Sequence, residues 1–299
     1  MGGTKQLIGD ALLIAGPTAS GKSSAALRLA EERNGVIVNT DSMQVYDVLR
    51  VLTARPSPEE IRRAPHHLYG HVSPLGPYSV GMWLADVESL MRDGAFEGRV
   101  PIFVGGTGLY FRALLQGLAA LPEIPPEIRE SLRAELLDQG PIPLFRRLAE
   151  LDAAGAALLK PADGHRIVRA LEVIQATGRP LRHWQAQPVS GLVDGSSASH
   201  FVVEPSRSVL HARIDRRFDR MIAEGARDEV RAVAALGLSP ELPAAKAIGL
   251  RELLAADRGD LGIEAAVEQA KAATRQYAKR QSTWFRTQFG EQWQRVEAL

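Results

Sequence analysis

A phosphate-binding loop near the start of the chain constrains the fold more than any other feature. Residues 16–23 read Gly-Pro-Thr-Ala-Ser-Gly-Lys-Ser, which matches the pattern G-x-x-x-x-G-K-[ST]. The apolar run 11–15 before the loop suits a buried parallel strand, and residues 24–32 after it carry Leu and Ala at helical spacing. This order predicts an α/β fold of the P-loop NTPase-like type, with a parallel sheet flanked by helices.

The loop is expected to bind a diphosphate or a triphosphate, because its glycines let the backbone curl around one anion at the start of a helix. Lys22, which we expect on a solvent-facing loop, should reach the outer phosphates, and the Ser23 hydroxyl should hold Mg²⁺. The alternative is an ordinary glycine turn with a solvated lysine, which the flanking strand and helix disfavour. The expected diphosphate-binding residues in the loop are Gly16, Pro17, Thr18, Ala19, Ser20, Gly21, Lys22 and Ser23.

Composition limits the remaining possibilities. The 299 residues, 45% of them hydrophobic, can bury one large core and a smaller appended domain. A net charge of +1, from 36 basic and 35 acidic side chains, means that any polyanion needs a local basic patch. The lack of cysteine excludes disulfides, thiolate metal sites and cysteine nucleophiles. Residues 1–6 lack a secretory leader and no apolar run approaches membrane-spanning length, so we expect a soluble cytoplasmic protein without a membrane partner.

Two more predicted strands end in polar or glycine-rich segments. Residues 35–38 lead into Asp41, and residues 100–104 lead into Gly105-Gly106-Thr107-Gly108. Since ligands bind at the carboxyl edge of open parallel sheets, Asp41 should lie beside the phosphate loop in a catalytic or magnesium-linked role, with a helix N-cap as the alternative. We expect the glycines to admit a ligand close to the backbone and Thr107 to present its hydroxyl there. The strand 100–104 has no acid at its end, which argues mildly against an ATPase.

The segment 52–80 is rich in loops, and we interpret the pair His66-His67 as structural because no third ligand stands at metal-binding spacing. An amphipathic helix is predicted over 80–91. Residues 121–198 form a predicted helical insertion, which ends in a Gly/Ser-rich linker at 187–199. The predicted domains are therefore a catalytic core of 1–120 and 199–299 and an insertion domain of 121–198, with a further core strand at 200–204.

Two arginine- and lysine-rich helices are predicted in the last third of the chain. Arg213 and Arg217 share one face of a helix over 210–221. A long helix over 264–286 carries Lys271, Arg275 and Lys279 at i, i+4 and i+8, and no acid occurs from 271 to 288. Because like charges at this spacing repel, we interpret these three residues, the basic stripe, as a surface for an anionic partner such as a phosphate backbone.

The motifs taken together resemble the tRNA dimethylallyltransferases. The resemblance rests on the phosphate loop 16–23, Asp-Ser-Met-Gln-Val-Tyr at 41–46, Pro-His-His-Leu at 65–68 and Gly-Gly-Thr-Gly-Leu-Tyr at 105–110. It continues through His-Arg-Ile-Val-Arg-Ala-Leu-Glu at 165–172, Ile-Gly-Leu-Arg-Glu at 248–252 and Tyr-Ala-Lys-Arg-Gln-Ser-Thr-Trp-Phe-Arg at 277–286. The motifs stand in order along nearly the whole chain, which makes them far more specific than a lone phosphate loop.

The resemblance implies transfer of a dimethylallyl group from dimethylallyl diphosphate to N6 of the adenosine immediately 3′ of the tRNA anticodon, at tRNA position 37. It implies Mg²⁺ as cofactor and the tRNA anticodon stem-loop as partner, gripped by the insertion domain, and we expect a monomer. The implied catalytic residues are Asp41, Lys22, Thr18, Thr107 and Arg217, the last also on the diphosphate. The implied tRNA-binding residues, with the basic stripe added, are Asp41, Ser42, Met43, Gln44, Thr107, Arg129, His165, Arg166, Arg169, Lys271, Arg275, Lys279 and Arg280.

Two other functions use some of the same residues. A small-molecule kinase would bind ATP in the phosphate loop and would need an arginine-rich lid. A non-catalytic RNA-binding protein would keep the basic stripe but would not require Asp41 or Thr107.

Overall fold

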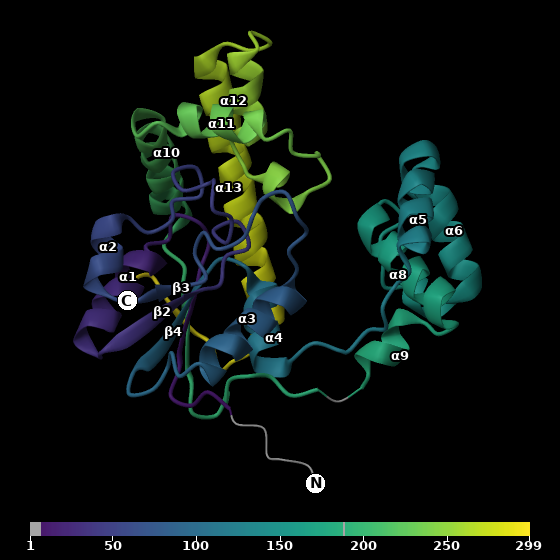
Figure 1. Ribbon diagram of the computed structural model, residues 1–299, viewed down its shortest axis with the longest axis horizontal. Coiled ribbons are helices and arrows are strands. Elements are labelled where there is room, and N and C mark those ends of the chain that lie inside the picture. The colour runs from purple at the N-terminus through teal and green to yellow at the C-terminus, as the bar shows by residue number, and fades with distance from the viewer. Residues whose placement is uncertain (1–6, 188) are drawn as a thin grey trace. The chain divides into compact units, whose positions relative to one another are not determined.

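The structure is a computed structural model that describes residues 7–187 and 189–299 (Figure 1). The leaderless start that we expected at residues 1–6 lies outside the described residues, as does residue 188. The chain divides into two compact units, one made of residues up to 116 together with 191–299, and the other of residues 117–190. None of the helices in the two described ranges is long and apolar enough to cross a membrane.

The first unit contains a six-stranded parallel sheet in the order β3-β2-β4-β1-β5-β6. Its strands are β1 (Leu12–Ala15), β2 (Gly35–Asn39), β3 (His66–His67), β4 (Val100–Gly105), β5 (Ser199–Val203) and β6 (Gln294–Val296). The predicted parallel sheet is confirmed, and so are its four apolar strands. The sequence analysis missed β3 and β6, because two or three half-exposed residues at a sheet edge have no apolar run to reveal them.

Successive residues of the central strands face opposite sides of the sheet, and both sides are covered by helices. On one side Leu13, Val38 and Phe103 join a core with Trp83 and Phe111. On the other side Leu12, Ile14, Ile37 and Ile102 pack against Leu27 and its neighbours in α1 (Lys22–Glu32). The alternation explains why these strands read as continuous apolar runs, since both of their faces are buried.

Helices of the first unit cover the sheet and extend beyond its carboxyl edge (Figure 1). The predicted helix over 80–91 is present as α3 (Val80–Arg92), the arginine-rich helix as α10 (Arg207–Ala223) and the last long helix as α13 (Ile263–Gln288). The others are α4 (Gly108–Gln116), α11 (Ala226–Ala235), α12 (Leu250–Asp257), the 3₁₀ helix η1 (Pro243–Lys246) and α2 (Pro58–Arg63). Helix α2 was missed, although Ser57 and Glu60 form the reciprocal capping box that marks a helix start.

The second unit is helical, as predicted. It consists of α5 (Pro126–Gln139), α6 (Pro141–Leu151), α7 (Ala153–Ala156), α8 (Gly164–Thr177) and α9 (Leu181–Gln185). Its own core contains Leu132, Leu144, Leu148, Ile167 and Leu171. Buried apolar residues spaced four apart, Leu144 with Leu148 and Ile167 with Leu171, explain why the segment forms its own compact unit.

The second unit ends earlier than the sequence predicted, at residue 190 and not 198. The Gly/Ser-rich stretch looked like a linker, but Leu192 and Val193 inside it are buried in the core of the first unit. Both residues donate backbone hydrogen bonds to the carbonyl of Leu114. The entry and exit of the second unit are adjacent, because a Cβ added at Gly117 would lie 2.6 Å from the carbonyl oxygen of Ser190.

Candidate active site

A cavity of about 360 Å³ opens at the carboxyl edge of the sheet within the first unit. Its polar wall comes from the phosphate loop and from residues 41–44, which follow β2. Its apolar wall comes largely from α10, through Ile214, Phe218 and Met221. The cavity therefore places a polar wall and an apolar wall around one space.

The phosphate loop is held in its curled form by contacts from inside and outside. Ala19 and Gly21 have φ values of 64° and 98°, in the left-handed region that lets the chain turn sharply. The Ser20 N–H donates to the Pro17 carbonyl at 3.2 Å. The Arg213 guanidinium, from α10, donates to the Ser20 carbonyl at 2.7 Å. Arg213 thus stabilises the conformation of the phosphate loop through a contact from α10.

Lys22 is buried, contrary to our expectation of a solvent-facing loop. Its side chain is 8% exposed, and Nζ donates to the Pro17 carbonyl at 3.1 Å. Burial lowers the pKa of Lys22 to about 8, Asp41 opposes that shift, and the positive charge of Arg217 adds to it. Burial likewise lowers the pKa of Arg217. Two desolvated cations in one cavity favour a strongly anionic ligand.

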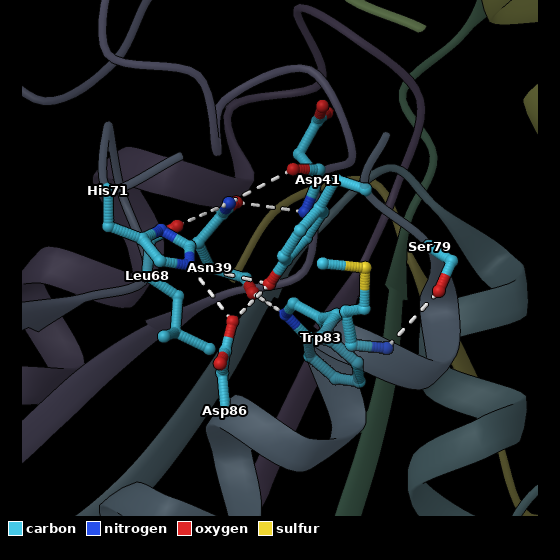
Figure 2. A network of polar contacts seen from close by, with 9 residues as sticks. Asn39, Asp41, Leu68, His71, Ser79, Trp83 and Asp86 are labelled. Atoms are coloured by element: carbon cyan, nitrogen blue, oxygen red, sulfur yellow. Dashed lines mark hydrogen bonds and ion pairs between the residues drawn. The ribbon is translucent and has the colours of Figure 1, made fainter. Parts of the chain in front are cut away.

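Asp41 caps a turn with one carboxylate oxygen and leaves the other oxygen available. Oδ1 accepts a hydrogen bond from the Met43 N–H at 2.9 Å. The backbone of Asp41 is fixed by Asn39, whose amide accepts from the Asp41 N–H at 2.8 Å and donates to the Asp41 carbonyl at 2.9 Å (Figure 2). Among residues 7–187 and 189–299, no side chain or backbone group donates to Oδ2. The capping and the chemical interpretations of Asp41 are therefore compatible.

The carboxyl end of β2 is held in place by hydrogen bonds of Trp83 and Asn39. Trp83 donates its indole N–H to the Asn39 carbonyl at 2.8 Å, and the Asn39 amide also donates to the Leu68 carbonyl at 2.9 Å (Figure 2). Since Trp83 is fully buried and stacks on Tyr110, this end of the strand cannot shift without disturbing the core. Asp41 is consequently presented from a rigid support.

We had expected Thr107 to present a free hydroxyl to the cavity, but its hydroxyl is engaged with Ser42. Its Oγ1 accepts from the Ser42 N–H at 3.0 Å and lies 3.3 Å from the Ser42 hydroxyl. The Thr107 N–H donates to the Thr40 carbonyl. Thr107 therefore ties the glycine cluster after β4 to the segment that carries Asp41.

The glycines of that cluster are needed for close approach. A Cβ on Gly105 would lie 2.2 Å from the backbone of Thr40, and a Cβ on Gly108 would lie 2.0 Å from the Trp284 ring. A Cβ on Gly106 would lie 2.2 Å from Nε2 of Gln281 and 3.4 Å from Oδ2 of Asp41. The cluster thus lets α13 and the Asp41 segment pack against β4.

Several cavity residues were not predicted as site residues. Arg217, which was predicted, lines the cavity and also donates a hydrogen bond to the Thr53 carbonyl at 3.3 Å. Ile214 and Met221 accompany it at one turn before and one turn after on α10, and Phe218 lies one turn after Ile214, a spacing that the sequence does contain. Lys246, Ile248, Thr274 and Tyr277 also line the cavity, and they come from distant segments that no local pattern connects.

The Ser23 hydroxyl could hold Mg²⁺ only together with oxygens of a bound phosphate compound. Ser23 and Asp41 are hard oxygen donors that line the same cavity. Within the described ranges, no group of three or more His, Cys, Asp or Glu side chains could hold a metal. The residues therefore fit an ion whose remaining ligands are phosphate oxygens and water, as is common for Mg²⁺.

Lys271 and Arg275 are paired with acids, so they do not form the row of mutually repelling charges on which the interpretation of the basic stripe was based. Lys271 is 8% exposed and forms ion pairs with Asp219 at 2.7 Å and Glu268 at 3.0 Å. Arg275 pairs with Asp215. Asp215 and Asp219 lie on α10 and Glu268 lies on α13 itself, so the neighbouring helix and the preceding turn supply the acids that are absent from 271 to 288.

The other two basic residues proposed on α13 have a different environment. Lys279 and Arg280 are exposed, and no acid pairs with either in the described parts of the chain. Arg280 lines the cavity and lies 5.7 Å from the centre of the Tyr277 ring. These two residues keep the charge that an anionic partner could contact.

The proposed tRNA-binding residues of the insertion lie in the second unit. His165 and Arg166 are exposed in the first turn of α8, and Arg129 is half-buried in α5. Arg169 pairs with Glu172 at 3.1 Å, so its charge is partly neutralised. Ser42, Met43 and Gln44 lie in the first unit and line the cavity.

The sequence matches two family models, one described as IPP transferase over residues 44–288 and one as isopentenyl transferase over 9–69. The chain belongs to the tRNA dimethylallyltransferase family. A tRNA dimethylallyltransferase from Mesorhizobium japonicum is 57% identical over 287 residues, which are 96% of this chain and 89% of that protein. One from Agrobacterium fabrum is 53% identical over 96% of this chain and 97% of its own length. As a member of this family the chain is a transferase.

Solved structures of the family have the same fold. A full-length tRNA isopentenylpyrophosphate transferase from Bacillus halodurans superposes with a TM-score of 0.66 at 32% identity, covering 98% of this chain and 90% of that one. A eukaryotic dimethylallyltransferase that acts on tRNA superposes with a TM-score of 0.79 at 27% identity, covering 94% and 70%. The P-loop-type α/β fold is thereby shown, and the kinase alternative is not favoured.

Proposed function

We propose that the protein transfers a dimethylallyl group from dimethylallyl diphosphate to N6 of the adenosine immediately 3′ of the anticodon in tRNA. The observation that carries the proposal is the single cavity in which Lys22 and Arg217, the Asp41 carboxylate and the apolar face of α10 meet. A cationic end suits a diphosphate, an apolar wall suits a five-carbon isoprenoid, and a carboxylate suits a proton acceptor. Each part of the two substrates thus has a matching surface.

The diphosphate would lie in the phosphate loop, against Lys22 and Arg217. Arginine suits this ligand because its planar fork can engage two oxygens at once. Negative charge accumulates on the diphosphate as it leaves, and two buried cations stabilise that charge without reorganising. The Ser23 hydroxyl would hold Mg²⁺ together with diphosphate oxygens, and when bound the ion supplies further positive charge at the leaving group.

The adenine would enter the cavity from the anticodon loop after leaving its stack, as in other enzymes that modify bases. Its N6 attacks C1 of the dimethylallyl group, the new C–N bond forms, and the C1–O bond breaks with its electron pair on the diphosphate. The proton released from N6 goes to Oδ2 of Asp41, the oxygen that accepts no hydrogen bond within the described chain. Oδ1 meanwhile keeps its bond to the Met43 N–H, which holds the carboxylate in one orientation.

Residues 42–44, with Arg280 at the cavity and His165 and Arg166 in the second unit, would contact the tRNA. A monomeric enzyme and a cytoplasmic location belong to the same proposal and stay predictions from the sequence. Thr18, a residue of the phosphate loop, lines the cavity and would orient the diphosphate. Thr107 would act through Ser42, which it holds in place.

The test is turnover of the purified protein with dimethylallyl diphosphate and a tRNA that has adenosine at the proposed position. We expect isopentenyladenosine among the nucleosides of the digested tRNA, detected by mass spectrometry, and none when that adenosine is replaced by guanosine. A parallel titration with ATP should give weaker binding than dimethylallyl diphosphate. Phosphoryl transfer from ATP without modified nucleoside would favour the kinase instead.

A further inference from the structure

One buried glutamine connects the two sides of the cavity. Gln281 is 5% exposed, and its Oε1 accepts from the Thr18 N–H at 2.9 Å while its Nε2 donates to the Gly106 carbonyl at 2.8 Å. We infer that Gln281 is a positioning residue for the transfer reaction. It fixes the phosphate loop relative to the side of the cavity that carries Asp41. The inference rests on the proposed function.

The two partners determine the orientation of the amide. The Thr18 N–H can only donate and the Gly106 carbonyl can only accept, so the oxygen must face Thr18 and the nitrogen must face Gly106. No other uncharged side chain of this length offers an acceptor and a donor at its end. A glutamate would place a carboxylate against the Gly106 carbonyl, and two acceptors would repel.

The helix that carries Gln281 is itself fixed. Ala278 and Phe285, one turn to either side, are buried, and the Trp284 ring covers Gly108. The side chain is thus supplied from a rigid element and not from a loop. A site held by packed elements keeps its geometry better than one held by loops alone.

The bridge joins the two groups that must meet in the reaction. Thr18 belongs to the loop proposed for the diphosphate, and Gly106 adjoins Oδ2 of Asp41, since a Cβ on this glycine would lie 3.4 Å from that oxygen. Each substrate would contact only one side of the bridge. Removing Gln281 should therefore leave binding of each substrate nearly intact and impair the step that needs both sides aligned.

The experiment compares Gln281→Met and Gln281→Asn with Gln276→Met, a matched control at an exposed glutamine of the same helix. Methionine keeps the length but makes neither bond, and asparagine keeps the amide but is one methylene too short to reach both partners. We expect the single-turnover rate at saturating tRNA and dimethylallyl diphosphate to fall about 10- to 100-fold in both Gln281 variants. Dissociation constants for tRNA and for inorganic pyrophosphate should change by less than about threefold, and the control should match the wild type.

A second measurement does not depend on activity. Hydrogen exchange of peptides that contain Thr18 should accelerate in Gln281→Met and stay unchanged in Gln276→Met, because the Thr18 N–H loses its acceptor. If the wild type turns over and the Gln281 variants keep its rate, the positioning role is wrong. If the wild type does not turn over, the proposed function fails, and an unchanged Thr18 exchange rate would then overturn the bridge as well.

Discussion

In the proposed mechanism Asp41 combines a structural and a chemical role in one side chain, one for each oxygen. We predict that Asp41→Asn keeps the turn, because its Oδ1 can still accept from the Met43 N–H, but cannot take a proton. The single-turnover rate with both substrates saturating should fall roughly 10²- to 10⁴-fold, the usual range for loss of a general base. The melting temperature and the tRNA dissociation constant should change little. A variant that reacts at the wild-type rate would show that Asp41 only caps the turn and does not accept the proton.

The buried charge of Lys22, proposed to bind the diphosphate, lowers the stability of the folded protein. Burial lowers the pKa of Lys22 from the ordinary value of 10.5 to about 8 in the folded protein, so between these pH values the unfolded chain binds a proton that the folded chain has lost. Stability must then rise with pH across this window, and below about pH 8 the charged lysine destabilises the fold.

We therefore predict that Lys22→Met is more stable than the wild type near pH 7, by roughly 1–3 kcal/mol after allowing for the lost bond to Pro17. The difference should shrink as the pH rises from 8 toward 10.5. Urea unfolding of both proteins at several pH values, without substrate or metal, measures it. The same variant should lose most of its activity. A stability difference independent of pH would show that Lys22 is not desolvated in the folded protein.

Gly106 should be intolerant of a side chain because of Gln281. An added methyl would lie 2.2 Å from Nε2, and that amide cannot move without breaking two hydrogen bonds. We predict that Gly106→Ala destabilises the protein by about 1–3 kcal/mol, the usual range for overpacking. In a double-mutant cycle with Gln281→Ala, which removes the clash, the two effects should not add. Additive effects in thermal unfolding would place the strain elsewhere.

At the scale of elements, α13 explains both successes and failures of the sequence analysis. The helix itself was predicted over 264–286, because helical periodicity is a local property of the sequence. The pairs that Lys271 and Arg275 form with Asp219 and Asp215 were not predictable, because these acids lie on another helix and become neighbours only through packing. The same holds for Glu229, whose two carboxylate oxygens accept from the N–H groups of Val51 and Leu52. The pair between Lys271 and Glu268 has the local i, i+3 spacing and could have been found in the sequence.

Two lysines on this helix provide a matched comparison. We predict that Lys279→Ala reduces the dependence of tRNA affinity on salt concentration, because its exposed charge has no acidic partner in the described ranges. Lys271→Ala should leave the salt dependence unchanged and lower the stability by about 1 kcal/mol, because it breaks an ion pair with an exposed partner. Binding measured at several salt concentrations, with urea unfolding of both variants, separates the two roles. Equal salt slopes for both variants would contradict this assignment.

At the scale of the whole molecule, the insertion is attached through one narrow connection. Gly117 and Ser190 are adjacent, and Leu192 returns at once to Leu114 of the core. The four apolar strands and the existence of a helical insertion were predictable from apolar runs and helical periodicity. The place where the chain re-enters the core was not, because a Gly/Ser-rich sequence conceals the two buried residues Leu192 and Val193.

We predict that replacing residues 118–189 by a few glycines leaves the first unit folded. The shortened protein should bind inorganic pyrophosphate about as well as the full chain, because Lys22, Arg213 and Arg217 all belong to the first unit. Its affinity for the anticodon stem-loop should fall at least about tenfold, given the loss of the arginines of α5 and α8. Titration calorimetry with both ligands measures these effects. Loss of pyrophosphate binding would mean that the insertion supports the loop.

The bond between Thr18 and Gln281 also orders events during protein synthesis. The two residues are 263 positions apart, so the phosphate loop leaves the ribosome long before its partner on α13 exists. A nascent or truncated chain can fold the helical insertion from local contacts, but its loop still lacks the contact that joins it to Gly106. The proposed catalytic geometry therefore cannot form before α13 has been synthesised, and a chain interrupted before residue 281 lacks the side chain that joins the loop to Gly106.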